Sequence, residues 1–209
     1  MPAAVRPAFE TLWNLDLALA DVVASSTDVR LGAIRLAWWR ERLEELDEGK
    51  APAEPRLQAI ARQLIKRGVT GKALSLLEDG WLPLLAPFPW GEEQAEGLRL
   101  RGRTLFGIGA RLLGCDSEDG DAAGELWSLV DAARHCSDAQ SRGILVDEAR
   151  AAIGRLPRQR MPKAVRGMTV LAALAAHDAL RSKPLDAGGD FARVAVATVH
   201  RLRGTFPPS

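Results

Sequence analysis

Apolar residues in this chain recur at helical spacing nearly everywhere, and no stretch alternates as a half-buried β-strand does. In the first stretch Phe9, Leu12 and Val23 fall along one helical face, and residues 25–28 close it and offer caps for the next helix. We expect helices over residues 9–24, 29–47, 55–67, 71–81, 92–113 and 119–141, followed by two or three more up to residue 209. About eight helices with short connectors predict an all-α fold in a single compact domain spanning residues 1–209.

Charge and composition narrow the possible functions. Lys and Arg number 28 against 27 Asp and Glu, and a net charge of +1 gives no overall field to recruit nucleic acid. Tyr is absent, which removes phenolic acids and bases from any mechanism, and two cysteines without CxxC spacing indicate free thiols in a reducing compartment. No apolar run approaches the roughly 20 residues of a membrane span, and we expect no secretory signal. These features predict a cytoplasmic protein that is at most peripheral to the inner membrane.

The most distinctive string is residues 35–40, Arg-Leu-Ala-Trp-Trp-Arg, in which two adjacent tryptophans stand between two arginines. Arg35 and Trp39 are four residues apart, which on a helix lets the guanidinium stack on the indole. One interpretation is a wall beside a pocket for an anionic headgroup. The other is a pair of core tryptophans whose neighbouring arginines pair with the glutamates at 41, 44 and 45.

Two further groups of polar residues are candidates for binding, although no familiar nucleotide, zinc or hydrolase motif is present. Asp131, His135 and Asp138 share one face of the helix expected over 119–141 and offer ligands for a divalent cation. Residues 99–104 contain three arginines that could meet phosphate. For both groups the alternative is a solvated helix face with local ion pairs.

Residues 32–43, Gly-Ala-Ile-Arg-Leu-Ala-Trp-Trp-Arg-Glu-Arg-Leu, resemble the motif G-x-I-R-L-Q-W-W-R-D-A-L of the squalene/phytoene synthase family. Residues 102–114 are similar to the helix that precedes the second active-site helix of that family, and residues 156–166 begin a stretch similar to its C-terminal part. The resemblance implies an all-α isoprenoid-synthase fold with a central cavity. It also implies head-to-head joining of two prenyl diphosphates, with Mg²⁺ held by two aspartate-rich motifs to neutralise the leaving group.

The sequence departs from this family where the metal would bind. The first D-x-x-x-D motif falls on residues 20–24, where both ends are alanine, and neither Asp16 nor Asp21 starts a register with a second carboxylate. The second motif would end on His135 and an alanine, or on Asp138 and an arginine. Because Mg²⁺ needs several hard oxygen ligands, we expect no resident metal and no other cofactor.

Three functions are compatible with this pattern. The first is a catalytically degenerate squalene/phytoene synthase-like protein that binds a lipid or isoprenoid-type ligand, or a protein partner. The complex I assembly factor branch of the family offers a precedent, since it is thought to act without prenyl transfer. The second is an active Mg²⁺-dependent prenyl transferase in isoprenoid biosynthesis, with a partner subunit supplying the missing carboxylates. The third is a helical domain with structural or interaction duties alone.

Under the first hypothesis, arginines around the former diphosphate site hold an anion directly, because a guanidinium pairs two phosphate oxygens at once. The alternative is that these arginines face outward and pair with glutamates. The candidate residues for the cavity or anion site are Asp16, Asp21, Arg35, Trp38, Trp39, Arg40, Arg101, Arg103, Arg134, His135 and Asp138. Adjacent helical residues point about 100° apart, so at least one of the two tryptophans is expected to be largely buried.

Overall fold

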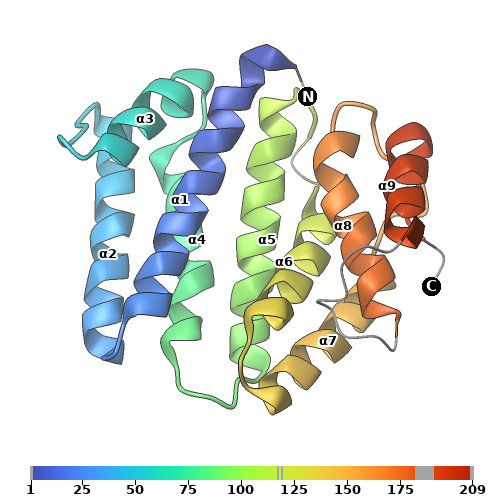
Figure 1. Ribbon diagram of the computed structural model, residues 1–209. Coiled ribbons are helices and arrows are strands. Elements are labelled where there is room, and N and C mark those ends of the chain that lie inside the picture. The colour runs from blue at the N-terminus through green and yellow to red at the C-terminus, as the bar shows by residue number, and fades with distance from the viewer. Residues whose placement is uncertain (1, 117, 119, 182–190, 208–209) are drawn as a thin grey trace. The chain divides into compact units, whose positions relative to one another are not determined.

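The structure, a computed structural model, describes residues 2–116, 118, 120–181 and 191–207. Among these residues it contains nine α-helices and no β-strand, which confirms the all-α prediction (Figure 1). The chain divides into two compact units, residues 1–87 and 88–209, and each is described on its own. The isoprenoid-synthase type, the central cavity and the single domain stay predictions.

The first unit is a bundle of four α-helices. These helices are α1 (Arg6–Ser25), α2 (Val29–Glu45), α3 (Pro55–Gln63) and α4 (Gly71–Trp81). Short 3₁₀ turns occur in the connections from α2 to α3 and from α3 to α4. Helix α4 packs against α2, both contact α1, and α3 packs on α1 (Figure 1). Leucines such as Leu12, Leu36 and Leu74 are fully buried and belong to the core of this unit.

Capping residues fix where the helices of this unit begin. The Asp28 carboxylate accepts hydrogen bonds from the amides of Arg30 and Leu31 at 2.8 and 3.0 Å, so the cap predicted before residue 29 is confirmed. The Thr70 hydroxyl accepts a hydrogen bond from the amide of Ala73 at 3.1 Å and caps α4, which begins at residue 71 as predicted. The Asp28 cap starts α2 after only three connecting residues, 26–28, beyond the end of α1.

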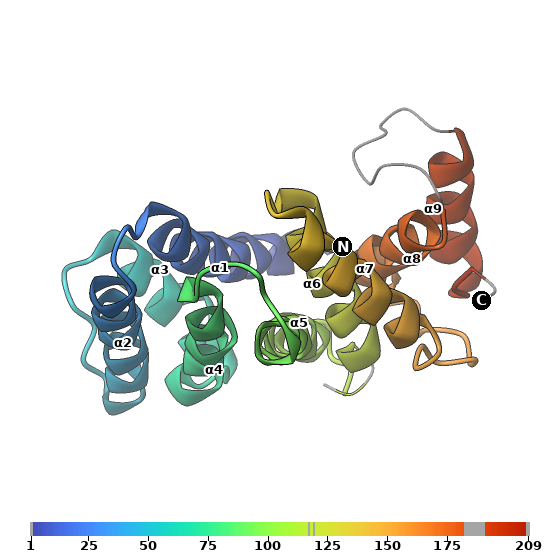
Figure 2. The same ribbon diagram turned by 90° about the horizontal axis from the view of Figure 1, so that it is seen from below.

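The second unit contains five α-helices. They are α5 (Glu92–Leu112), α6 (Asp121–His135), α7 (Ala139–Ile153), α8 (Arg166–Ala179) and α9 (Phe191–Arg203). Helix α5 packs closely along α6, and α9 packs on α8 (Figure 2). Among the described residues, Cys115 is half-buried and Cys136 is buried, and the two are not joined by a disulfide. No helix within the described parts of the chain is both long enough and apolar enough to cross a membrane.

The prediction of one continuous helix over residues 119–141 is wrong, because the chain leaves helical geometry after His135. Cys136 adopts an extended conformation, with φ −76° and ψ 120°. Asp138 then begins α7, since its carboxylate accepts hydrogen bonds from the amide and hydroxyl of Ser141 at 2.7 and 2.6 Å. Asp131, His135 and Asp138 therefore do not share one helical face.

Candidate functional site

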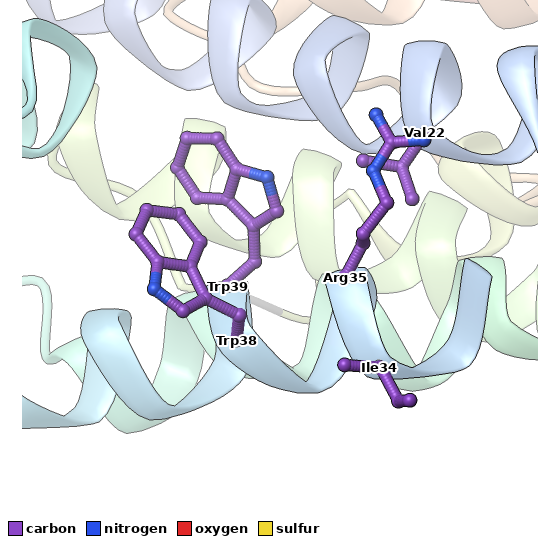
Figure 3. Close-up of a pocket in the computed structure, with 5 residues that line it drawn as sticks. All are labelled: Val22, Ile34, Arg35, Trp38 and Trp39. Atoms are coloured by element: carbon purple, nitrogen blue, oxygen red, sulfur yellow. The ribbon is translucent and has the colours of Figure 1, made fainter. Parts of the chain in front are cut away.

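A pocket of about 390 Å³ lies between α1 and α2 in the first unit (Figure 3). Its lining residues are Val22, Ile34, Arg35, Trp38 and Trp39. The volume lies near the lower end of the range of about 300–1,000 Å³ that is typical of small-molecule pockets. Three of the candidate residues predicted from sequence, Arg35, Trp38 and Trp39, are thus brought together at one place.

The sequence left open whether the two tryptophans form the wall of a pocket or belong to the core, and the structure gives each of them a different position. Trp39 is 7% exposed and belongs to the core, which confirms that at least one of the pair is largely buried. Trp38 is 40% exposed, and its ring meets that of Trp39 edge to face, with the ring centres 5.3 Å apart. Ile34 is 65% exposed on the same helix, four residues before Trp38. An exposed indole and an exposed isoleucine therefore give the pocket an apolar surface that water reaches.

Arg35 supplies the charge at this pocket. Its guanidinium extends towards α1 beside Val22 (Figure 3) and donates a hydrogen bond to the Ser25 hydroxyl at 3.2 Å. Stacking on Trp39, which the spacing predicted, does not occur. In the part of the chain that the structure describes, Arg35 has no carboxylate partner. Its positive charge is consequently not neutralised by the protein at this rim.

Arg40, the second arginine of the motif, faces a buried carboxylate instead of the neighbouring glutamates. Its Nη1 lies 3.6 Å from Oε2 of Glu78 on α4, and the Glu78 side chain is almost fully buried. That oxygen has no hydrogen-bond partner. Burial raises the pKa of Glu78, and the nearby Arg40 only partly opposes this effect. Arg40 therefore partly neutralises the buried Glu78 carboxylate within the first unit.

The candidate arginines of the second unit are each paired with a carboxylate. Arg101 contacts Asp131 at 3.1 Å and lies over the Trp127 ring, 4.8 Å from its centre. Arg103 pairs with Glu96 at 2.8 Å and with Glu125 at 2.7 Å. Arg134 pairs with Asp178, which also holds Arg193. These contacts favour the ion-pair interpretation for this group of arginines.

The residues considered as metal ligands from the sequence are either exposed or hydrogen-bonded to other parts of the protein. Asp16 is buried on α1 and accepts a hydrogen bond from the Trp81 indole at 2.8 Å. Asp21 is exposed, while His135 is exposed at the end of α6 and its Nδ1 lies 2.8 Å from the Asp131 carbonyl. The two hydrogen bonds from Ser141 lower the pKa of the Asp138 carboxyl at the start of α7.

The resemblance implies Mg²⁺, and the residues present do not fit it. Asp16 and Asp138 already bind protein donors, and Asp131 is paired with Arg101. Among the described residues, no three His, Cys, Asp or Glu side chains are grouped so that they could hold a metal ion. Such an ion would need several oxygens converging on one point.

No family model, no curated protein and no solved structure matches this chain. The resemblance to squalene/phytoene synthases therefore stays a prediction from residues 32–43 and the two weaker stretches.

Sequence reasoning missed several residues of the site and its surroundings. Ile34 and Val22 line the pocket, Ser25 holds Arg35, and Glu78 faces Arg40. A signal for Ile34 existed, because it stands four residues before Trp38 and so lies on the same helical face. Ser25 and Glu78 belong to other helices, and their contacts depend on tertiary packing that one-dimensional spacing does not contain.

Proposed function

We propose that this chain is a catalytically degenerate squalene/phytoene synthase-like protein that binds an isoprenoid-type amphiphile with an anionic head. The binding site is the pocket between α1 and α2, where Arg35 meets the phosphate end and Trp38 with Ile34 meets the hydrocarbon. The motif that resembles the family, residues 32–43, contains these three residues.

One observation carries this proposal: an arginine without a carboxylate partner lies beside exposed apolar side chains. In the described residues Arg35 is bonded only to a neutral hydroxyl, whereas Arg101, Arg103 and Arg134 are each neutralised by a carboxylate. A guanidinium with open donors favours a phosphate oxygen pair. Covering the Ile34 and Trp38 side chains removes apolar surface from water and so favours a ligand with a hydrocarbon tail.

The lining of the pocket supports binding more than chemistry. Of its five residues, four are apolar or aromatic, and the fifth is an arginine, whose guanidinium donates hydrogen bonds and accepts none. This set contains no carboxylate to hold a metal and no His, Cys, Asp or Glu side chain to act as a general acid or base. The proposed activity is therefore retention of the amphiphile, without cleavage of its diphosphate.

The test is a calorimetric titration of the full chain with farnesyl diphosphate in EDTA. We expect binding, weakened by salt because the head contact is electrostatic. Inorganic pyrophosphate and farnesol, which each lack one half of the amphiphile, should bind more weakly. The Arg35→Gln variant should lose roughly tenfold or more in affinity, because a hydrogen bond to a charged group is removed.

A matched control removes one positive charge elsewhere in the same unit. Arg62 on α3 is exposed, and the variant Arg62→Gln should bind farnesyl diphosphate as the parent does. The proposal fails if the Arg35 and Arg62 variants lose affinity equally, or if farnesyl diphosphate does not bind. Binding that requires Mg²⁺ would instead support the active prenyl transferase.

A further inference from the structure

The geometry of α9 points to a second binding surface, and we propose that this helix lies on the surface of an anionic membrane. The proposal concerns the second unit, and it is independent of the pocket between α1 and α2.

Helix α9 turns its most apolar stripe to solvent. Phe191 is 91% exposed and Leu202 is 73% exposed, while Val194 and Val199 are also exposed. At about 100° per residue, Leu202 lies only about 20° around the helix from Phe191. Val194 and Val199 then fall about 60° and 80° to either side. Together with the exposed Ala195 and Thr198 that lie between them, the four side chains form one mostly apolar stripe that the described protein leaves uncovered.

Two arginines border this stripe, one on each edge. The same helical geometry places Arg201 just beyond Val194, at about 80° from Phe191, and Arg203 beyond Val199, at about 120°. Both are exposed, and neither has an ion-pair partner among the described residues. Arginines at the edges of an apolar stripe can keep their charge at lipid phosphates while their stems cover hydrocarbon.

The opposite face of α9 fixes the helix to its own unit. His200 is fully buried, and its Nε2 lies 2.8 Å from the Thr169 hydroxyl on α8. Arg193 pairs with Asp178, and Arg166 donates to the carbonyl of Leu202 at 2.7 Å. The polar contacts thus lie beneath the helix, so the exposed stripe is held in place and presented outward.

Charge favours an anionic lipid surface over a second copy of the chain as the partner of this stripe. Residues 191–207 contain three arginines and no Asp or Glu, although Asp and Glu make up 27 of the 209 residues. Two copies of the stripe would bring like charges together, whereas acidic lipid headgroups neutralise them. Each basic residue held near such a surface strengthens binding by about fivefold at low ionic strength.

The experiment is co-sedimentation of the full chain with vesicles. We expect binding to vesicles of equal parts phosphatidylcholine and phosphatidylglycerol, little binding to phosphatidylcholine alone, and release by salt. The Leu202→Asp variant should lose roughly tenfold or more in partitioning, because an apolar side chain is replaced by a repelled charge. The double variant Arg201→Gln and Arg203→Gln should lose about thirtyfold on the anionic vesicles.

Matched control variants distinguish binding through α9 from a general effect of removing any exposed leucine or any positive charge. Leu17→Asp on α1 changes an exposed leucine of the first unit, and Arg158→Gln with Arg160→Gln removes two exposed charges outside α9. Both should partition as the parent does, and circular dichroism should show all variants equally helical. The proposal is overturned if the anionic vesicles do not bind the chain, or if the control variants lose as much binding as the α9 variants. It is also overturned if Leu202→Asp instead abolishes a dimer seen in sedimentation equilibrium.

Discussion

At the scale of single residues, Trp38 and Trp39 show how one step along a helix changes what a side chain contributes. Trp39 is 7% exposed and Trp38 is 40% exposed, because consecutive side chains point about 100° apart. We predict that Trp39→Ala lowers the free energy of unfolding by about 3–5 kcal/mol, mainly through the cavity that it leaves. Trp38→Ala should cost less than half as much. Urea denaturation of both variants measures this, and equal losses would contradict the assignment of Trp39 to the core.

Glu78 gives a pH-dependent prediction. Burial raises its pKa above the ordinary value of 4.5, so this residue stabilises the fold most when protonated. Its contribution is full below about pH 4.5 and is lost as the pH rises through the raised pKa. The variant Glu78→Gln should therefore gain stability relative to the parent as the pH rises from about 4.5 to 7. Urea denaturation across this range measures the difference. A difference that stays constant with pH, or that reverses sign, would show that Arg40 fully compensates the buried charge.

The sequence predicted some side-chain roles and not others for a physical reason. Burial of one tryptophan follows from helical spacing alone, since two adjacent side chains cannot both leave the core of an apolar helix. The partners of Arg40, Arg101 and Arg134 do not follow, because Glu78, Asp131 and Asp178 come from other helices. Ion pairs between helices need the packing of the whole unit, which spacing along one helix does not contain.

At the scale of helices, caps and breaks explain where prediction succeeded. The starts at Asp28 and Thr70 were predicted correctly because a short polar side chain there can accept from free amides. The same chemistry was overlooked at Asp138, whose carboxylate starts α7 and interrupts the helix expected over 119–141. The sequence offered Asp138 as a metal ligand. An aspartate is also typical of a helix start, because its carboxylate can accept a hydrogen bond from the amide three residues later, here that of Ser141.

Two glycines set the close approach of α5 and α6. A Cβ added at Gly102 would lie 2.1 Å from the carbonyl oxygen of Gly124, which is backbone and cannot move aside cheaply. We predict that Gly102→Ala lowers the free energy of unfolding by about 1–3 kcal/mol or more, through overpacking. Gly143→Ala on α7 is the control, because nothing lies within 4 Å of its added Cβ. That variant should gain up to about 1 kcal/mol from lower backbone entropy in the unfolded chain. Thermal melts of both compare the two; a Gly102 variant as stable as the Gly143 variant would contradict the packing described.

At the scale of the whole molecule, the chain combines two units with different exposed surfaces. The boundary at residues 87 and 88 falls between α4 and α5, in a stretch that contains Pro83, Pro87 and Pro89. The first unit contains the pocket with Arg35, and the second contains the apolar stripe of α9. An isoprenoid-type ligand and a membrane surface are chemically compatible, since such ligands partition into lipid.

The central claim is that the chain holds a prenyl diphosphate without a metal and without reaction. The most direct measurement is equilibrium dialysis of radiolabelled farnesyl diphosphate against the full chain, with Mg²⁺ in one arm and EDTA in the other, followed by chromatography of the recovered label. We predict equal retention in both arms, lower retention by Arg35→Gln, and recovery of the label as unchanged farnesyl diphosphate. Retention confined to the Mg²⁺ arm, or conversion of the label to a coupled hydrocarbon product that EDTA abolishes, would contradict it.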